Sequence, residues 1–305
     1  MDDAREPTLA QRVAALGYDF AGQPKEHVPS CNLCGRRGRH IEVARRDRYG
    51  YPARCVVCGR CGLGYLSPRL TEEGYASFYA GVYRPLVSAY HGRRIDAETV
   101  QLDQRGYAAD LVAFLAPLMP SPPRTILDVG GSTGVVARTV AEGLGGQHTV
   151  LDPSPRELAL AGASGAEVIA GFAETFDPGE RRWDLVLLCQ TIDHLLDIRR
   201  TLLVLRSLTA AGGRAFVDVL DVELVMRRTG SIEGAVKIDH PFYLTGATAA
   251  AFFALAGYTV IGGRLTDDGH RGFMLAPGDL AEPNWSALEA RASGFLGDIQ
   301  ALSPT

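Results

Sequence analysis

The chain has 305 residues, of which 46% are hydrophobic and 22% charged, a composition typical of a globular protein with one large and one small domain. Its net charge of −4 offers no overall attraction to nucleic acid or to an anionic membrane. Its apolar runs are shorter than the roughly 20 residues that span a bilayer, and its acidic, polar beginning does not resemble a secretion signal. These features predict a cytoplasmic protein with reduced thiols.

The N-terminal part of the chain, residues 1–70, predicts a leader followed by a small cysteine-rich module. Residues 9–16 have the spacing of a short helix. Residues 30–68 contain many Cys, Gly and Arg but few aliphatic residues, so we expect no apolar core there. The next segment, 71–123, predicts helices that form a linker or lid, beginning at Thr71, which two glutamates follow.

From residue 124 onward, short apolar runs alternate with helical segments. This alternation predicts a Rossmann-like α/β domain over residues 124–280, with a parallel sheet and helices on both faces. A tail at 281–305 follows, with one helix at 285–296. The strands are expected at 125–129, 148–152, 167–170, 183–189, 213–220, 258–265 and 271–276, and the helices at 134–141, 157–163, 199–208 and 247–256.

Five of the six cysteines are clustered, and their spacing is typical of a zinc site. Cys31 and Cys34 form one Cys-x2-Cys pair and Cys58 and Cys61 a second, each followed by glycine. Such turns let four thiolates surround one Zn²⁺ at about 2.3 Å, with backbone N–H groups directed at sulfur. Cys55 is an alternative partner for Cys58 on spacing alone. Because four thiolates close the coordination shell, the predicted metal is structural.

Six of the arginines between the two cysteine pairs lie close together, at residues 36–48. A solvated surface is the simpler interpretation. The alternative is a patch that contacts the phosphates of a nucleotide sugar or of RNA. The six are Arg36, Arg37, Arg39, Arg45, Arg46 and Arg48.

A glycine-rich turn after the first strand of the α/β domain predicts a nucleotide site. Asp128 lies at the end of the strand, and Gly130, Gly131 and Gly134 let the backbone approach a ligand closely. Asp152 ends the next strand, where a carboxylate can accept hydrogen bonds from both hydroxyls of a ribose. A nicotinamide dinucleotide also fits this spacing. Three features disfavour the dinucleotide. An acid ends the first strand, the turn lacks a Gly-x-Gly-x-x-Gly pattern, and an acidic element follows the third strand.

Residues 124–220 resemble a class I S-adenosylmethionine (SAM) dependent methyltransferase. The run Leu-Asp-Val-Gly-Gly-Ser-Thr-Gly at 127–134 is similar to the first motif of that family. The segments 183–197 and 208–214 are similar to its fourth and fifth strand motifs. The resemblance implies an enzyme that uses SAM as its cofactor.

The same resemblance implies roles for individual residues. The glycines of the turn would pass the methionine part of SAM, and Asp152 would bind the ribose. Phe172 and Ala173 would face the adenine, and Gln190 would lie near the methionine or the sulfonium. Many relatives have Asp where this chain has Phe172, so stacking or a neighbouring contact must hold the adenine ring here.

A narrower resemblance covers most of the chain. Residues 58–69 look like the N-terminal zinc module of the sugar C-methyltransferase group, which favours Cys58 and Cys61 as ligands. Residues 239–245 are similar to the Glu-His-x-x-Tyr-Phe-Ser segment of that group, with Asp239 in place of Glu. That group continues with a further C-terminal domain that these 305 residues do not include, so O- or N-methylation is expected at least as much as C-methylation.

In the sugar C-methyltransferases, a histidine after the fourth strand and the Glu-His pair line the sugar site. The resemblance therefore implies that His194, His240 and Asp239 are catalytic, as bases or acceptor contacts; structural histidines are the alternative. A positioned base contributes roughly 10²–10⁴-fold when a hydroxyl is the acceptor. Three tyrosines are expected to contact the acceptor, with ordinary packing as the alternative. They are Tyr79, Tyr83 and Tyr243.

The sequence therefore predicts a SAM-dependent methyltransferase with a structural Zn²⁺. We expect a small polar acceptor, such as a nucleotide-linked sugar or a precursor of a natural product or surface glycan. The alternative is an RNA methyltransferase whose zinc module grips RNA, which the acidic net charge disfavours. A non-catalytic scaffold with the same fold is disfavoured by the intact glycines and Asp152. The oligomeric state stays open.

Overall fold

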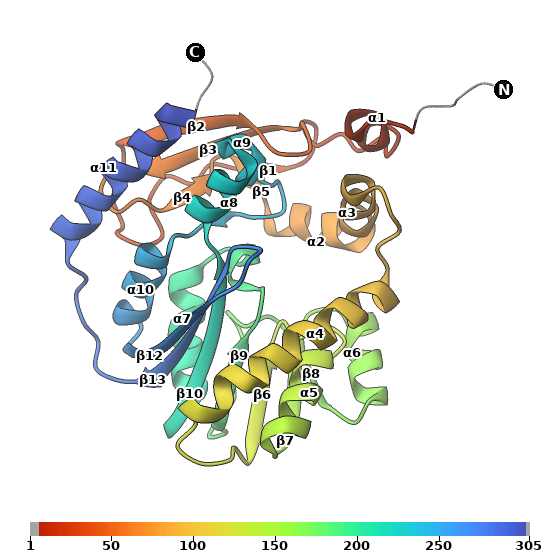
Figure 1. Ribbon diagram of the computed structural model, residues 1–305, viewed down its shortest axis with the longest axis vertical. Helices are drawn as coiled ribbons and strands as arrows, with labels where there is room; N and C mark the ends of the chain where they lie inside the picture. Colours follow the sequence, from red (N-terminus) through yellow and green to blue (C-terminus); the bar gives the residue numbers. More distant parts are fainter. Residues whose placement is uncertain (1–5, 303–305) are drawn as a thin grey trace.

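A seven-stranded sheet forms the centre of the computed structural model, which describes residues 6–302 (Figure 1). The strand order is β12-β13-β10-β9-β6-β7-β8. Neighbouring strands from β8 to β10 are parallel, whereas β13 is antiparallel to both β10 and β12. The expected Rossmann-like α/β sheet is confirmed. Its strands are β6 (Thr125–Val129), β7 (Gln147–Asp152), β8 (Glu167–Ala170), β9 (Trp183–Leu188), β10 (Thr209–Leu220), β12 (Tyr258–Leu265) and β13 (His270–Pro277).

Helices cover both faces of this sheet, as the alternation of apolar residues along its strands requires. In β6, Ile126 belongs to an apolar cluster with α4 and α5, whereas Leu127 and Val129 belong to a cluster with α7 and α10. The helices are α4 (Ala97–Leu115), continued by the short η1 (Ala116–Leu118), α5 (Val135–Leu144), α6 (Pro155–Ala163), α7 (Ile198–Leu208) and α10 (Gly246–Leu255).

The segment expected to be helical ahead of the sheet forms α2 (Glu72–Gly81) and α3 (Tyr83–His91) before α4. Thr71 caps α2, because its hydroxyl accepts a hydrogen bond from the backbone N–H of Gly74. Gly92 ends α3 with a φ of 65°, a conformation that glycine adopts readily. The N-cap prediction at Thr71 is confirmed.

The cysteine-rich segment forms strands with an apolar face, and this face packs into a core that the segment shares with the rest of the molecule. Leu33, Val56 and Tyr65 are fully buried. They belong to the same cluster as Leu127 of the large sheet, which supplies the apolar partners that the segment itself lacks. The strands are β1 (Lys25–Glu26), β2 (His40–Arg46), β3 (Pro52–Cys58), β4 (Gly64–Leu66), β5 (Arg69–Leu70) and, from far along the chain, β11 (Phe242–Tyr243).

Two connections join this N-terminal sheet, of order β11-β4-β3-β2, to the rest of the molecule. The strand β11 pairs with β4 in antiparallel fashion. The last helix, α11 (Trp285–Leu302), runs beside the N-terminal sheet and buries Leu288, Phe295 and Ile299 (Figure 1). The helix expected at 285–296 is therefore present, longer than expected and buried along one side.

The remaining helices are α1 (Leu9–Ala14), α8 (Val222–Thr229) and α9 (Ile232–Ala235). Among the described residues, none of the helices combines the length and the apolar character needed to cross a membrane. The ends of the expected leader and tail, residues 1–5 and 303–305, lie outside the described part of the chain.

Candidate active site and cysteine cluster

The glycine-rich turn after β6 is packed so closely that side chains are excluded from it. Gly130 has a φ of 70°, and its N–H donates a hydrogen bond of 2.7 Å to the carbonyl of Leu151. A Cβ atom on Gly130 would lie 2.7 Å from Cγ2 of Thr191, and one on Gly131 would lie 2.7 Å from the Asp128 carboxyl carbon. At Gly130 and Gly131 the turn therefore has no room for a side chain, and its backbone is open to close approach by whatever binds above it.

Asp128, under this turn, is buried. Its burial, reinforced by the negative charge of Asp152, raises the pKa of Asp128 to about 8. The Asp128 side chain is therefore mostly protonated at neutral pH. Its contact with Gly131 makes it a support for the turn.

The Asp152 carboxylate, at the end of β7, holds the turn from the other side. Its Oδ2 accepts a hydrogen bond from the N–H of Ser132 (3.0 Å) and its Oδ1 accepts one from the N–H of Ser154 (2.8 Å). The Ser132 hydroxyl donates to Glu157 (2.9 Å), and Gly134 begins α5 with a φ of 75°. A carboxylate can accept about four hydrogen bonds, so Asp152 can still accept two from a ligand.

The other expected cofactor residues surround the carboxyl ends of β8 and β9. Phe172 is 47% exposed, whereas the neighbouring Ala173 is buried. Gln190 is exposed and has a φ of 50°, uncommon for a residue with a side chain. Its N–H donates to Asp218 Oδ1 (2.5 Å), and the hydroxyl of Tyr107 donates to the other oxygen (2.6 Å). This network fixes the loop after β9.

Four residues after Gln190, His194 is held by one ring nitrogen. Its Nδ1 lies 2.7 Å from the Tyr79 hydroxyl and 3.1 Å from the carbonyl oxygen of Asp239. The Tyr79 hydroxyl itself donates to the Asp239 carbonyl (3.0 Å). When Nδ1 carries the proton, it donates a hydrogen bond to this pair, and the Tyr79 hydroxyl keeps its own bond to the Asp239 carbonyl. This arrangement leaves Nε2 of His194 unprotonated.

His240 lies directly beside this histidine, with ring centres 4.6 Å apart. Its Nε2 lies 3.3 Å from Nζ of Lys237 and 3.5 Å from Oδ2 of Asp239. Burial, followed by the nearby Lys237 charge, lowers the pKa of His240 well below its usual value, and burial lowers the pKa of His194 as well. Both imidazoles are therefore neutral at pH 7.

Ligand atoms of His194, Asp239 and His240 lie within 4.8 Å of one another, a spacing that a metal ion also accepts. The charge distribution opposes this use. The Lys237 ammonium group, 3.3 Å from Nε2 of His240, would repel a divalent cation. The trio is therefore better suited to hydrogen bonding and proton transfer than to coordination.

The three expected acceptor tyrosines are not all placed alike. Tyr79 and Tyr83, on α2 and α3, lie with their ring centres 5.3 Å apart, and both rings contact His194. Tyr243 is buried, and its hydroxyl donates to the Lys237 carbonyl (2.7 Å) and accepts from the Lys237 N–H (3.0 Å). The structure therefore brings Tyr79 and Tyr83 to the histidines, whereas Tyr243 holds the turn that carries Lys237.

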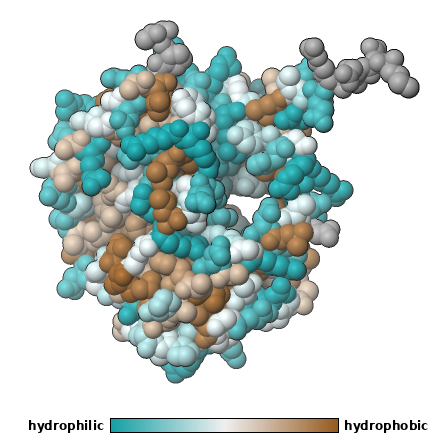
Figure 2. All heavy atoms as spheres, in the orientation of Figure 1, coloured by the Kyte–Doolittle hydropathy of each residue, from teal (hydrophilic) through white to brown (hydrophobic). Residues whose placement is uncertain are grey.

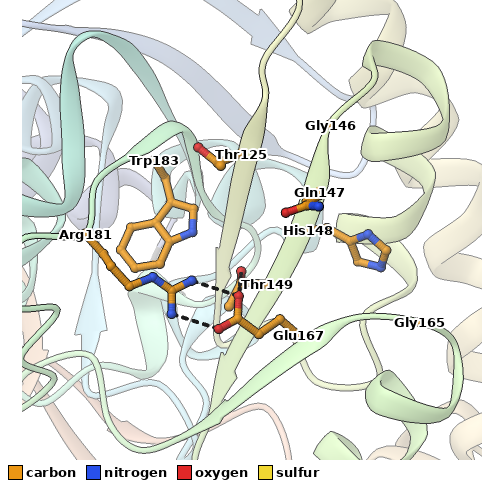
Figure 3. Close-up of a pocket in the computed structure, with 9 residues that line it drawn as sticks. All are labelled: Thr125, Gly146, Gln147, His148, Thr149, Gly165, Glu167, Arg181 and Trp183. Atoms are coloured by element: carbon orange, nitrogen blue, oxygen red, sulfur yellow. Dashed lines mark hydrogen bonds and ion pairs between the residues drawn. The ribbon is translucent and has the colours of Figure 1, made fainter.

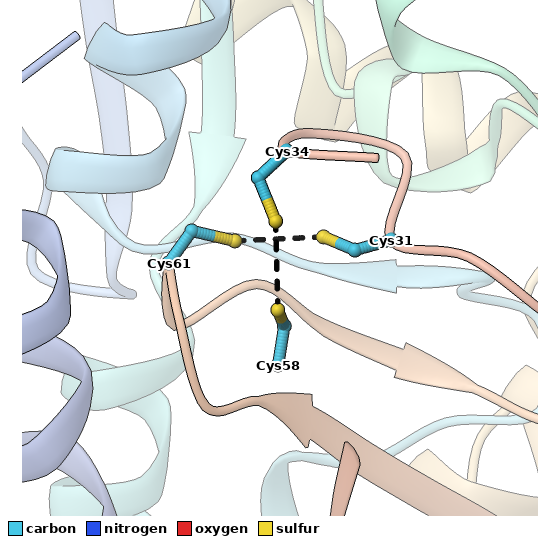
Figure 4. Close-up of side chains that lie close together, drawn as sticks. All are labelled: Cys31, Cys34, Cys58 and Cys61. Carbon is cyan, nitrogen blue, oxygen red and sulfur yellow. Dashed lines mark hydrogen bonds between the residues drawn. The ribbon is translucent and has the colours of Figure 1, made fainter. Parts of the chain in front are cut away.

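The four expected metal ligands meet at one point, with their sulfur atoms facing one another (Figure 4). The Sγ atoms of Cys31 and Cys61 lie 3.4 Å apart and those of Cys34 and Cys58 lie 3.7 Å apart. Ligands at 2.3 Å in a tetrahedron lie about 3.8 Å from one another. The four cysteines therefore lie at zinc-binding distance.

Cys55, the alternative on spacing, lies outside this group and is buried in a different apolar cluster, whereas Cys61 is part of the group. Backbone N–H groups point at the sulfurs, as the glycine-containing turns predict. The N–H of Arg36 donates to Cys34 and the N–H of Arg60 donates to Cys58.

The cysteine cluster is linked to the loop that carries His194. Between the first two cysteines, the side chain of Asn32 donates to Asp197 Oδ1 (2.8 Å) and accepts from the N–H of Arg199 (3.2 Å), at the beginning of α7. From β5, Arg69 donates to the carbonyl of Leu196 (2.9 Å). The module therefore braces the segment that directly follows the catalytic candidate.

A hollow of about 390 Å³ lies at the amino ends of the strands, away from the glycine-rich turn. It is lined by the first residues of β6, β7 and β9 (Figure 3). Arg181 spans it with a two-pronged ion pair to Glu167, at 2.7 and 2.8 Å, and stacks over Trp183. Ligands of parallel α/β sheets bind at the carboxyl ends of the strands. This hollow is therefore not our candidate site.

The family model described as a methyltransferase domain matches residues 100–262, more than half of the chain. The chain belongs to this methyltransferase family. No curated protein matches it. The match covers every strand of the parallel part of the sheet and the glycine-rich turn.

Solved methyltransferase structures are similar in fold. Magnesium protoporphyrin IX methyltransferase from Synechocystis PCC 6803, with bound SAH, is 13% identical, with a TM-score of 0.50 over 60% of this chain and 89% of that chain. The 1,6-didemethyltoxoflavin-N1-methyltransferase from Burkholderia thailandensis is 19% identical, with a TM-score of 0.50 over 71% of this chain and 96% of that chain. The expected class I methyltransferase fold is confirmed.

Two residues of the site escaped the analysis of the sequence. Lys237 belongs to no motif, although it is a half-buried lysine between the buried apolar residues Val236 and Ile238. Arg48 was counted among the six arginines of the cysteine-rich segment. Its side chain, unlike that of Arg45, turns away from the exposed edge and stacks on Tyr90.

Proposed function

We propose that this methyltransferase transfers the methyl group of SAM to a small polar acceptor, with His194 as the base. The observation that carries the proposal is the hydrogen bonding of His194. Tyr79 and the Asp239 carbonyl occupy its Nδ1 and leave Nε2 free to take a proton. This nitrogen belongs to the loop after β9, which also packs against the glycine-rich turn through Thr191.

The residues around the turn would hold SAM, whose sulfonium group supplies an electrophilic methyl carbon when bound. The side-chain-free backbone at Gly130 and Gly131 fits a closely approaching ligand. The spare acceptor sites of Asp152 fit the two ribose hydroxyls, and the exposed ring of Phe172 offers a surface on which adenine can stack. Gln190 would lie beside the methionine portion.

On the acceptor side, each candidate has a distinct task. His194 takes the proton of the acceptor through Nε2. Asp239 positions His194 through its carbonyl, and His240 packs against the His194 ring and receives the Lys237 ammonium group. Tyr79 and Tyr83 lie on the helices of the segment 71–123, the proposed lid over the acceptor.

The proposed acceptor is a nucleotide-linked sugar or a precursor of a natural product or surface glycan. The tight packing of neutral histidines and tyrosines around one base suits a small molecule. The arginines of the cysteine-rich segment weigh against the RNA alternative, since Arg45 and Arg54 are paired with Glu42 and Arg48 is turned inward. Binding to RNA that is tight and falls steeply with salt would favour that alternative instead.

The four cysteines would hold a structural Zn²⁺. A set of four thiolates, all facing one point, is the set that closed zinc sites use, and it leaves no position for a substrate. The bound ion would fix Asn32, and through it the beginning of α7. We assign it no step in methyl transfer.

Isothermal titration calorimetry of the zinc-loaded protein with SAM and with S-adenosylhomocysteine (SAH) tests the proposal. We expect both to bind, and we expect transfer of a labelled methyl group to acceptors extracted with the protein. Binding of a nicotinamide dinucleotide in place of SAM and SAH would contradict the assignment of the donor.

A further inference from the structure

Two cationic side chains lie beside the histidine pair without an anionic partner. Within residues 6–302, neither Lys237 nor Arg48 forms an ion pair with a carboxylate. The Lys237 ammonium group has His240 Nε2 at 3.3 Å. The Arg48 guanidinium carbon lies 4.0 Å from the ring centre of Tyr90 and 4.9 Å from that of Tyr49, and its buried Nε–H donates no hydrogen bond.

Hydrogen bonds hold the turn that carries Arg48 against the segment that carries Lys237. The N–H of Arg48 donates to the carbonyl of Val236 (2.9 Å), and the N–H of Ile238 donates to Asp47 Oδ2 (3.1 Å). The turn between β2 and β3 is thus fastened to the residues on either side of Lys237. Figure 2 shows the surface hollowed between the upper part of the molecule, which contains this turn, and the lower part around α4.

Placing two half-buried cations near each other costs free energy unless an anion compensates. Burial, and after it the charge of Arg48, lowers the pKa of Lys237 to about 8, so the ammonium form still predominates at pH 7. The Arg48 charge also lowers the pKa of His240. Asp239 and Asp193 offset the charge of Lys237 only from a distance.

We propose that Arg48 and Lys237 form an oxyanion subsite that binds a carboxylate or phosphate group of the methyl acceptor. This inference rests on the proposed function, because it makes the anion part of the acceptor. The planar guanidinium group, with its Nη2 donating to the Tyr49 hydroxyl and its Nε–H unpartnered, matches such a group in shape and charge.

The subsite also limits the size of the acceptor. Lys237 contacts His240, and His240 packs directly against His194, so one imidazole ring separates the ammonium group from the base. The negative group of the acceptor therefore lies only a few bonds from the atom that is methylated. An acceptor with a remote charge, or with none, would leave Arg48 and Lys237 uncompensated.

Calorimetry of the SAH-loaded protein with sodium phosphate and, separately, sodium malonate at pH 7 and constant ionic strength tests the subsite. We expect one of the two to bind at millimolar concentration, phosphate for a phosphorylated acceptor and malonate for a carboxylate. Arg48→Gln and Lys237→Gln should each weaken binding by about tenfold or more. The matched control is Arg45→Gln, an arginine of the neighbouring strand with an exposed side chain, which should leave the affinity unchanged.

Absence of binding by both probes at up to about 20 mM, which means a binding free energy weaker than about 2.3 kcal/mol, would overturn the subsite. Equal affinity of wild type, Arg48→Gln and Lys237→Gln would overturn it as well. Binding of SAH is measured first for every variant, so a wild type that binds SAH but neither probe refutes the subsite alone. A wild type that does not bind SAH refutes the proposed function. If Lys237→Gln does not fold, Lys237→Arg replaces it and should retain the affinity.

Discussion

At the scale of single residues, the Asp152 carboxylate combines two tasks. It accepts backbone hydrogen bonds from Ser132 and Ser154, which shape the turn, and it has acceptor capacity left for a ligand. The carboxylate is itself buried, so its hydrogen bonds are charge-assisted and little screened by water.

We therefore expect Asp152→Asn to weaken binding of SAH by about 10- to 100-fold, since a hydrogen bond to a charged group is worth about 1.5–3 kcal/mol. Calorimetry measures the change. The control is Asp177→Asn, an exposed acid in the loop after β8, which should bind SAH like the wild type. An Asp152→Asn variant with unchanged affinity would mean that the ribose lies elsewhere.

A second residue-scale prediction concerns pH. Burial lowers the pKa of His194 below its usual 6.5, so Nε2 is free at pH 7 and gains a proton only as the pH falls below 6.5. We expect kcat/KM of the wild type to be independent of this group above pH 7 and to fall below pH 6.5. His194→Gln should be slower by about 10²–10⁴-fold and should lose the acidic limb of the profile. If the fall in kcat/KM at acidic pH persists in His194→Gln, that fall reports the titration of another group.

The sequence predicts these residues because each belongs to a local motif. The glycines, Asp128 and Asp152 follow strands at fixed spacing, and the cysteines pair within two turns. Arg48 and Lys237 belong to no such motif. They lie far apart in the chain and meet only because the turn after β2 hydrogen-bonds to Val236, which no local pattern indicates.

At the scale of elements, α7 depends on a side chain from the N-terminal cysteine-rich segment. Asp197 caps α7 by accepting from the N–H of Arg200, and the same oxygen accepts from Asn32. Asn32 also accepts from the N–H of Arg199, one of the free donors of the first turn. A residue of the cysteine-rich module thereby completes the cap of a helix that begins just after His194.

We expect Asn32→Ala to destabilise this helix end by about 1 kcal/mol, as loss of a cap does elsewhere, and to lower kcat while leaving SAH affinity unchanged. Steady-state kinetics and calorimetry measure the two effects. Arg37→Ala, an exposed side chain on the same module, is the control and should change neither. Equal loss of kcat and of SAH affinity in Asn32→Ala would indicate general unfolding instead of a local effect on the His194 loop.

Elements with a long apolar pattern are predicted well, and short ones are not. The central strands of the large sheet, such as β6 and β9, are buried on both faces, so continuous apolar runs mark them within a few residues. The strand β11 has two residues, and β1 and β5 also have two each. Because their pairing partners are distant in sequence, the pairing of β11 with β4 and that of β1 with β5 emerge only from the tertiary structure.

At the scale of the whole molecule, the two sheets share one core, and the cysteines are part of it. Cys31, Cys58 and Cys61 are buried in the same cluster as Leu127 of the large sheet and Leu288 of α11. A bare set of four thiolates at this position is unfavourable, because it crowds like charges or leaves thiols in place of bonds to a metal. Metal binding is therefore expected to stabilise the entire chain.

Removal of zinc with 1,10-phenanthroline should lower the Tm of the whole protein in a single transition, because the two sheets unfold together. Structural zinc contributes about 10–16 kcal/mol in isolated zinc-finger peptides. A loss of even about 3 kcal/mol corresponds to a fall in Tm of about 5 °C in a protein of this size. Cys61→Ser should lose both zinc and this stability, whereas Cys55→Ser, a buried cysteine outside the cluster, should keep its zinc. A zinc-free protein with the Tm of the loaded one would show that apolar packing alone holds the module in place.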